Sequence, residues 1–326
     1  MHISRRKLFE GSVLAAIAAQ ATAKDARTGM PTRMLGSTGQ RVSLLAFGCG
    51  SRWLAYKEED KALEAMKRGV DQGITYIDTA YGYGNGLSEE RVGKFLKARK
   101  GGRKGLFIAT KIDARDGDKA QQIFEGSLKR IGVDHVDLVH IHSMTDEADL
   151  AMAEKKGNVL DRIHKFRDQK MARFIGITSH TNPEVLKAAL ERHDFDCTQM
   201  ALNLARMGNS APSDKPGEGM TGPRGFESIA LPVALRKKMG VLAMKAFAQE
   251  KLLGKAPIET LLRFSMSLPV SAVVAGMPQL EHIDENIRVA KAFQPMNRDE
   301  MERMSADAAG RFKASIDRHF ADHVDG

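Results

Sequence analysis

Short apolar runs alternate with amphipathic stretches along most of the chain. Eight of these runs have the length and continuity of strands buried on both faces of a parallel sheet. They cover residues 42–47, 75–78, 106–110, 136–141, 174–177, 197–201, 241–244 and 272–274. Between them, apolar residues recur at helical spacing in 60–69, 89–98, 120–131, 159–166, 185–190, 229–238 and 258–266. Each of these stretches is predicted to be a helix with one buried face.

Eight strand–helix units in succession favour a closed parallel barrel, and we predict an α/β fold of the (β/α)8 TIM-barrel type. A short hairpin-like segment, residues 32–39 with turn residues Gly36 and Gly39, precedes the first strand. The alternative is an open doubly wound sheet. That fold holds dinucleotides with a GxGxxG loop after its first strand, and residues 48–51, GCGS, lack the third glycine.

Two connections, residues 143–158 and 206–227, are long, and the second is rich in Gly, Pro and Ser. Loops of this length are functional lids or disordered segments. Both follow the carboxyl ends of strands, where the active sites of barrels lie, so both interpretations stay open.

The composition is that of a globular enzyme, with 42% hydrophobic and 28% charged residues in a chain of 326. The net charge of +9 comes largely from scattered helix positions without an aromatic–basic motif, so no nucleic-acid partner is expected. A mildly positive field would instead attract an anionic cofactor. Cys49 and Cys197 form no CxxC or Cys/His cluster, which argues against a zinc or iron–sulfur site. The strands that carry them are not neighbours, so no disulfide is expected.

Residues 1–23 have the pattern of an export signal. Arg5 and Arg6 precede Leu8-Phe9, a short apolar stretch at 11–19, and Ala21-Thr22-Ala23, an A-x-A cleavage site. The paired arginines resemble a twin-arginine signal, which directs folded proteins to the twin-arginine export machinery. We predict cleavage after Ala23, a periplasmic location and one mature domain, residues 24–326. The apolar stretch is too short for stable membrane insertion. The alternative is a disordered basic start.

Polar residues interrupt three consecutive apolar runs at their carboxyl ends. Asp78 ends the second run, Lys111 follows the third, and His142 follows the fourth. In a barrel such ends converge on one mouth. Tyr83 comes shortly after Asp78 in a glycine-rich segment that is flexible enough to fold back over that mouth.

These four side chains suit proton transfer to an oxygen that is gaining negative charge. A tyrosine ordinarily has a pKa of about 10, too high for efficient proton exchange at neutral pH, but a neighbouring ammonium stabilises the phenolate. A carboxylate keeps the lysine charged and oriented, and an imidazole can bond the carbonyl oxygen of a substrate. The hydride must come from a cofactor, because no side chain supplies one. Taken singly, these residues have simpler explanations, such as a salt bridge or surface packing.

His140 shares a strand face with His142. An HxH pair can bind a metal, and metal-dependent hydrolases use barrels, but that interpretation leaves Tyr83 and Lys111 unexplained. We predict that His140 is a core residue or contacts the catalytic residues without touching the substrate, and that no metal is bound.

Residues 73–89, GITYIDTAYGYGNGLSE, resemble the signature of the aldo-keto reductase family. Further matches are 109–111 (ATK), 136–142 (VDLVHIH), 173–179 (RFIGITS) and 285–286 (EN), so the likeness covers roughly 32–292. The resemblance implies a barrel that reduces carbonyl compounds with a nicotinamide cofactor. It also implies a catalytic tetrad, which falls on Asp78, Tyr83, Lys111 and His142.

The resemblance also implies cofactor contacts. Gln199 matches a glutamine near the nicotinamide, Thr178-Ser179 replace a Ser-Asn pair, and Met244 stands where an aromatic is frequent. Lys245 is expected to neutralise the pyrophosphate. The full expected set is Gly48, Cys49, Asp78, Thr178, Ser179, Gln199, Met244, Lys245, Ala246, Gly276, Met277, His282, Glu285 and Asn286.

Many NADP-preferring relatives have a lysine where Gly276 stands and an arginine where His282 stands. The resemblance to the family favours NADP(H) as the cofactor, and NAD(H) is the alternative. Trp53, the single tryptophan, is expected to line the substrate site together with Tyr83 and His142. The expected substrate is an aldehyde, a ketone or a sugar carbonyl. The alternatives are a cofactor-binding sensor or regulatory subunit with little turnover, and a metal hydrolase on the same fold.

Overall fold

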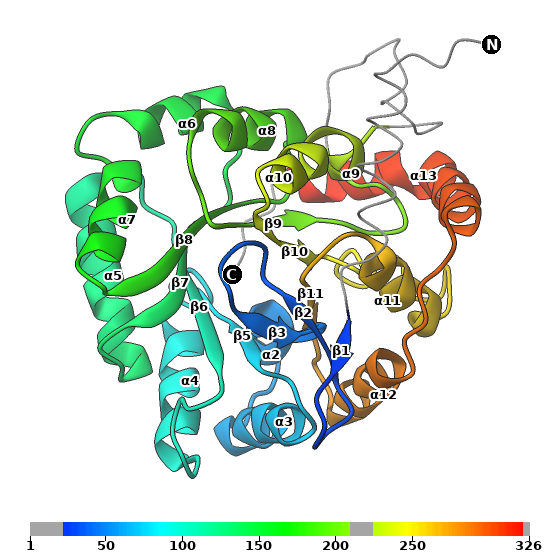
Figure 1. Ribbon diagram of the computed structural model, residues 1–326, viewed down its shortest axis with the longest axis horizontal. Coiled ribbons are helices and arrows are strands. Elements are labelled where there is room, and N and C mark those ends of the chain that lie inside the picture. The colour runs from blue at the N-terminus through cyan, green and yellow to red at the C-terminus, as the bar shows by residue number, and fades with distance from the viewer. Residues whose placement is uncertain (1–21, 209–223, 322–326) are drawn as a thin grey trace.

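A computed structural model describes residues 22–208 and 224–321, and Figure 1 shows their strands closed into a ring that helices surround. The barrel strands are β4 (Leu45–Gly48), β5 (Tyr76–Asp78), β6 (Phe107–Ile112), β7 (Val136–Ile141), β8 (Ala172–Ser179), β9 (Cys197–Ala201), β10 (Gly240–Met244) and β11 (Ala272–Gly276). All neighbours pair in parallel, and β11 closes the ring by pairing with both β10 and β4. The predicted (β/α)8 barrel is confirmed.

Amphipathic helices cover the outside of this barrel. They are α3 (Glu59–Asp71), α4 (Leu87–Ala98), α5 (Gly117–Ile131), α7 (Val159–Asp168), α8 (Pro183–Arg192), α10 (Leu231–Arg236), α11 (Ile258–Ser267) and α12 (Leu280–Lys291). The helix expected over 229–238 is interrupted: α9 (Phe226–Ile229) ends there, and α10 begins with Pro232 in its first turn. A proline lacks the N–H that a continuous helix needs, which accounts for the break.

The N-terminal hairpin closes the floor of the barrel. β2 (Pro31–Met34) pairs antiparallel with β3 (Arg41–Ser43), and β1 (Ala23–Lys24) adds a third strand. Gly36 has a left-handed φ of 55°, and a Cβ there would lie 2.2 Å from the backbone nitrogen of Gly240. Only a glycine therefore lets the turn press against the barrel.

The prediction of a single strand over residues 42–47 is wrong, because two strands share this range. Residues 42–43 finish β3 of the hairpin, and the barrel strand β4 begins at Leu45. The Ser43 hydroxyl donates to the Leu45 carbonyl at 2.6 Å at this change of direction. Both strands are buried, so their side chains form one apolar run in the sequence.

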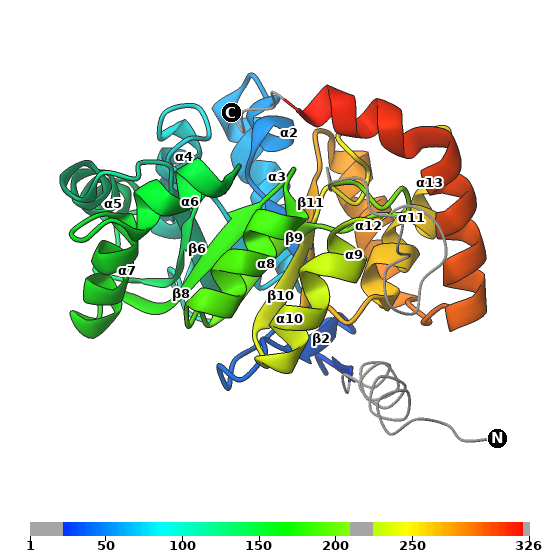
Figure 2. The same ribbon diagram turned by 90° about the horizontal axis from the view of Figure 1, so that it is seen from above.

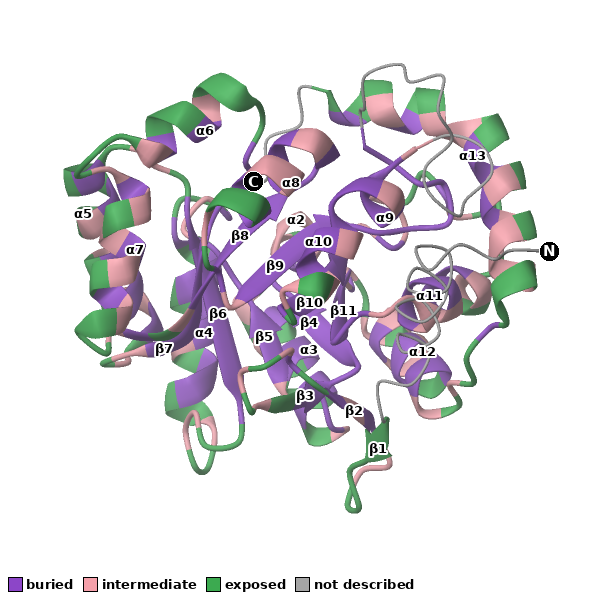
Figure 3. Ribbon diagram, turned by 45° about the horizontal axis from the view of Figure 1, so that its top comes forward, coloured by how far each residue is buried: buried purple, intermediate pink, exposed green. Residues whose placement is uncertain are grey.

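The barrel interior is apolar at its amino end, where Leu35 and Val42 of the hairpin meet side chains from the strands. The rings of Tyr76, Phe107 and Phe174 stack across three strands, with centroids 5.1 Å and 6.3 Å apart. Figure 3 shows the barrel strands almost entirely buried. The polar interior residues therefore gather at the carboxyl end.

The connection 143–158 is not an irregular loop, because it contains α6 (Glu147–Glu154), which Asp146 caps. Of the other long connection, residues 209–223 lie outside the described residues. Also unpredicted were α2 (Ser51–Leu54), α12 and α13 (Arg298–Phe320). Figure 2 shows α13 running along one edge of the molecule, and its C-terminal part reaches the side away from the hairpin, where α2 also lies. Over residues 22–208 and 224–321, no helix is long and apolar enough to cross a membrane.

Candidate active site

Three neighbouring strands deliver the predicted catalytic residues to one place. Lys111 donates from Nζ to Asp78 Oδ2 at 2.7 Å, to the Thr79 carbonyl at 3.0 Å and to the Tyr83 hydroxyl at 3.1 Å. Asp78 and Lys111 are each 1% exposed, so this ion pair is shielded from water. All three ammonium donors are used within the protein.

The loop that carries Tyr83 is fixed where it enters α4. Gly84, Asn85 and Gly86 all have positive φ, which turns the chain back from β5 into α4. Ser88 then donates to the Cys49 carbonyl at 2.9 Å, and Glu89 accepts from Arg130 at 2.7 Å.

The buried Glu89 carboxylate also accepts from the Thr110 hydroxyl, next to Lys111 on β6. Burial raises the pKa of Glu89, and the hydrogen bonds from Thr110 and Arg130 oppose the shift. The Ser-Glu pair that ends the signature therefore ties the tyrosine loop to the strand that carries the lysine.

His142 lies beside Tyr83, with ring centroids 5.6 Å apart and the rings nearly perpendicular. Its Nδ1 is hydrogen-bonded to Asp113 Oδ1, so Nε2 is the ring atom directed away from this carboxylate. Asp113 was not predicted. It directly follows β6, as His142 follows β7, and this shared position was the signal available in the sequence. A Cβ on Gly82 would lie 2.6 Å from Asp113 Oδ2, so Gly82 makes room for the carboxylate.

His140 is fully buried and packs against Gly176 of β8, where a Cβ would come within 2.4 Å of its Nδ1. Burial, and secondarily Lys111 and His142, hold the pKa of His140 well below its usual value. The ring is therefore neutral at neutral pH. Among the described residues, no group of three or more His, Cys, Asp or Glu side chains could hold a metal.

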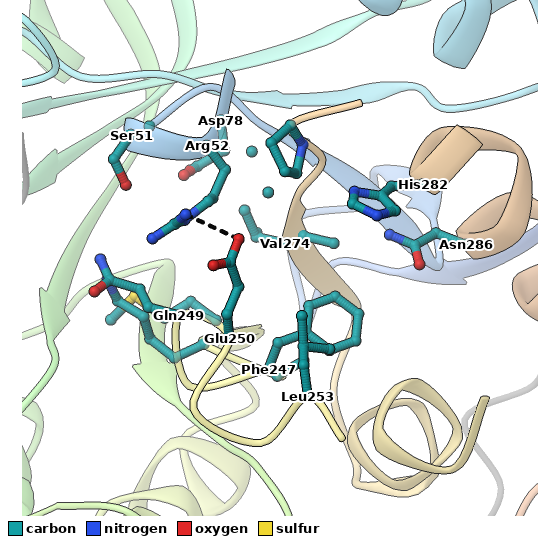
Figure 4. A pocket seen from close by; sticks show the side chains of 18 of the residues that line it. Ser51, Arg52, Asp78, Phe247, Gln249, Glu250, Leu253, Val274, His282 and Asn286 are labelled. Carbon is teal, nitrogen blue, oxygen red and sulfur yellow. Dashed lines mark hydrogen bonds and ion pairs between the residues drawn. The ribbon is translucent and has the colours of Figure 1, made fainter. Parts of the chain in front are cut away.

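A cavity that is open to solvent runs from Asp78 and Tyr83 to α12. Figure 4 shows it from close by, with His282 and Asn286 of α12 along one side. The predicted cofactor residues that line it are Gly48, Asp78, Gln199, Met244, Lys245, Ala246, Gly276, His282 and Asn286. Gln199 also reaches Asp78 Oδ2, at 3.3 Å from its Nε2.

The residues along this cavity fit a dinucleotide. Arg52 and Lys245 supply cations, and α12 brings its amino end to the cavity, which suits phosphate groups. Gly276 leaves the space in which Arg52 packs, because a Cβ there would lie 2.7 Å from Arg52 Cβ. Arg52 then crosses to Glu250 at 2.8 Å, the contact drawn in Figure 4. Neither Arg52 nor Glu250 was predicted, since neither a four-residue helix nor a turn carries a periodic pattern.

The other predicted cofactor residues, Cys49, Thr178, Ser179, Met277 and Glu285, do not line the cavity. Thr178 Oγ1 accepts from the Ser143 backbone N–H at 2.7 Å, and Ser179 Oγ donates to the Met144 carbonyl at 2.7 Å. These hydroxyls join β8 to the chain that leaves β7. His180, which was not predicted, lines the cavity instead.

Trp53 does not line the cavity either, contrary to expectation. Its indole is 0% exposed and donates to the Ala62 carbonyl at 2.9 Å. Phe47 packs edge-on against it, and the Arg91 guanidinium lies over its ring. Trp53 is therefore a core residue that holds α2 against α3. Cys49 and Cys197 are both buried, free thiols.

The fold and the site define the class of protein. It is an α/β-barrel enzyme in which a buried lysine–aspartate pair contacts a tyrosine at the carboxyl ends of the strands. The sequence profile of the Aldo/keto reductase family matches residues 45–215, which include these residues. The chain belongs to this family, and it is an NAD(P)-dependent oxidoreductase.

Curated relatives agree with this assignment. L-galactose dehydrogenase from Arabidopsis thaliana is 25% identical over 298 residues, 84% of this chain and 92% of the relative. An aldo-keto reductase of Mycobacterium leprae is 28% identical over 265 residues, 81% of this chain and 86% of the relative.

Two solved structures share the fold. The holo form of an aldo-keto reductase from Bacillus halodurans has a TM-score of 0.67 at 22% identity and covers 86% of this chain and 97% of its own. A Klebsiella pneumoniae aldo-keto reductase in complex with NADPH has a TM-score of 0.63 at 19% identity and covers 88% of this chain and 94% of its own.

Proposed function

We propose that the protein reversibly reduces an aldehyde, a ketone or a sugar carbonyl with NAD(P)H, and that Tyr83 supplies the proton. The observation that carries this proposal is the 3.1 Å contact between the Tyr83 hydroxyl and the buried Lys111 ammonium, beside a cavity suited to a dinucleotide. A sensor or regulatory subunit would need the cavity but would not need this contact.

The bound cofactor would supply a hydride to the carbonyl carbon. Tyr83 donates its hydroxyl proton to the carbonyl oxygen as the C=O π bond breaks, so that an alcohol forms. The tyrosinate that remains is stabilised by Lys111, which Asp78 keeps charged and oriented. With a proton on each ring nitrogen, His142 would donate from Nε2 to the carbonyl oxygen and from Nδ1 to Asp113, which fixes the direction of the ring. In the oxidation of an alcohol, Tyr83 takes up the proton.

For the cofactor, Gln199 and Met244 would contact the nicotinamide, Arg52 and Lys245 the phosphates, and Asn286 the adenosine. We propose NADP(H) as the preferred form, which is the cofactor named for the Klebsiella structure. Gly276 and His282 offer no fixed positive charge at the adenosine end, so NAD(H) is the rival. Dissociation constants measured for both cofactors decide between them, and a tenfold preference for NAD(H) would contradict the proposal.

Replacement of Tyr83 by Phe tests the proposed role of its hydroxyl. We expect kcat for a generic aldehyde to fall by about 100-fold or more, because general acid catalysis contributes on this scale. The cofactor dissociation constant, measured by nicotinamide fluorescence, should change little. Turnover should also survive a chelator, unlike that of a metal hydrolase.

Loss of activity in Tyr83→Phe together with loss of cofactor binding would point to a structural effect instead. A wild-type protein that binds cofactor but reduces no member of a broad aldehyde and ketone panel would support the regulatory-subunit alternative.

We further propose that residues 1–23 direct export to the periplasm and that the mature protein is the single domain 24–326. In support, Ala23 and Lys24, which flank the expected cleavage site, are both exposed. N-terminal sequencing of periplasmic protein should begin at Lys24, and retention of Met1 would contradict the proposal.

A further inference from the structure

His180 lies at the catalytic mouth although it belongs to no predicted set of site residues. It directly follows β8, is 3% exposed, and lines the same cavity as Asp78 and Tyr83. Its ring centroid is 6.1 Å from that of His142, at an interplanar angle of 61°. Tyr83, His142 and His180 thus form a row of successive ring contacts, with centroid spacings of 5.6 Å and 6.1 Å, and Tyr83 and His180 line the cavity.

The backbone beneath His180 is held firmly. The Met144 N–H donates to the Thr178 carbonyl at 2.8 Å, and the side chains of Thr178 and Ser179 bond the same connection. These contacts join the end of β8 to the chain just beyond His142. The two imidazoles therefore keep a fixed separation, which is what a specificity-determining pair requires.

The chemistry of the row indicates what His180 would contact. If the carbonyl oxygen of a substrate lies between Tyr83 and His142, a substituent on the adjacent carbon can lie next to His180, whose ring neighbours that of His142. A histidine ring can donate or accept a hydrogen bond, so it suits a hydroxyl group. Lys111 is unsuited to bind a substrate carboxylate, because its three donors already bond Asp78, Thr79 and Tyr83.

We propose that His180 determines substrate specificity by hydrogen-bonding a hydroxyl on the carbon next to the carbonyl. The favoured substrates are then α-hydroxy aldehydes and ketones, including open-chain sugars. This inference rests on the proposed carbonyl reductase function, and it assigns part of the same cavity to substrate rather than to cofactor.

Matched aldehydes with and without the hydroxyl test the inference, for example glycolaldehyde against acetaldehyde and glyceraldehyde against propionaldehyde. For the wild type, we expect kcat/KM to be about tenfold or more higher for the hydroxylated member of each pair, because a site built to bond a hydroxyl rejects the analogue that lacks it. His180→Phe should reduce this ratio by about tenfold or more, and His180→Gln should restore part of it. His135→Phe replaces a histidine remote from the cavity and should leave the ratio at the wild-type value.

The outcomes separate the inference from the function on which it rests. A His180→Phe variant that loses activity equally on both members of a pair would overturn the inference. So would a variant that weakens cofactor binding without changing the ratio, because His180 would then contact the nicotinamide. Equal kcat/KM values of the wild type on both members would also overturn it, with the proposed function intact. A wild type that reduces neither member would overturn the function itself.

Discussion

Asp113 is the residue on which the orientation of His142 depends. The carboxylate bonds Nδ1 of the imidazole, and Gly82 leaves the space that it occupies. Asp113 is about 40% exposed on its side chain, whereas His142 is buried. A partly hydrated carboxylate therefore places the ring that would bond the substrate oxygen.

We predict that Asp113→Asn lowers kcat/KM by about tenfold or more and changes its pH profile, because an amide no longer stabilises a proton on Nδ1. Asp116→Asn is a matched control, since Asp116 caps α5 on the same connection without touching His142. Steady-state kinetics over a range of pH check the prediction. An unchanged pH profile would show that Asp113 is not needed to orient the ring.

Sequence reasoning found the tetrad residues because polar side chains at strand ends stand out against apolar runs. It did not find Asp113 or His180. Each directly follows a barrel strand, and their closeness to His142 is seen only when the register of neighbouring strands is known. It misplaced Thr178 and Ser179, because the direction of a small hydroxyl depends on where the chain leaving β7 lies. For Trp53 it could not tell a residue near the mouth from one beneath it.

Among the elements, strands β7 and β8 are packed so closely that a large side chain on one requires a glycine on the other. His140 of β7 fills the space left by Gly176 of β8, and a Cβ at Gly176 would also approach the Cys197 carbonyl to 2.7 Å. The contact involves three adjacent strands, so it cannot be relieved by moving one side chain.

We predict that Gly176→Ala destabilises the protein by about 1 to 3 kcal/mol, the usual cost of overpacking a core. Gly310→Ala is the matched control: nothing lies within 4 Å of a Cβ at this exposed position in α13, and alanine favours a helix by about 1 kcal/mol over glycine. Urea unfolding of both variants measures the difference. A Gly176→Ala protein as stable as wild type would mean that the strands can shift apart at no cost.

Strong periodicity made the barrel strands and most of the covering helices predictable. The elements that were missed or given wrong bounds each have a local cause. Residues 42–47 are buried in both β3 and β4, and Ser43, the one polar residue among them, did not stand out as the boundary between two strands. The 23-residue α13 has few buried residues, among them Ile316 and Phe320, which gives a weak apolar stripe. α6 occupies a stretch whose length suggested a loop.

For the molecule as a whole, Glu227 links stability to pH. Burial raises its pKa to about 7, against the opposing charges of Arg206 and Lys313. The folded protein therefore takes up this proton near neutral pH, whereas an unfolded carboxyl does so only near its model value of 4.5. The contribution to stability is fully present below about pH 4.5 and is lost as the pH rises through about 7.

We predict that Glu227→Gln, which resembles the protonated form, is as stable as the wild type near pH 5 and more stable by about 1 to 3 kcal/mol near pH 8. Glu125→Gln, on the exposed side of α5, should show no such difference. Denaturant unfolding at several pH values measures it. A constant offset between wild type and Glu227→Gln across this range would exclude a titrating Glu227.

The closure of the barrel followed from the number of strand–helix units, a property of the whole chain that local errors do not affect. A buried acid such as Glu227 has no comparable signature, because its environment is assembled from α9, the chain after β9, and α13.

The position of Trp53 also gives the protein a built-in optical probe. With one tryptophan in the chain, ultraviolet excitation of indole reports from a single known place, the apolar pocket between α2 and α3. The neighbouring residue, Arg52, lines the cavity, so the emission spectrum should register how tightly that corner is packed without any label. A shift of the emission to longer wavelength would mark the moment at which water reaches the indole, independently of events elsewhere in the barrel.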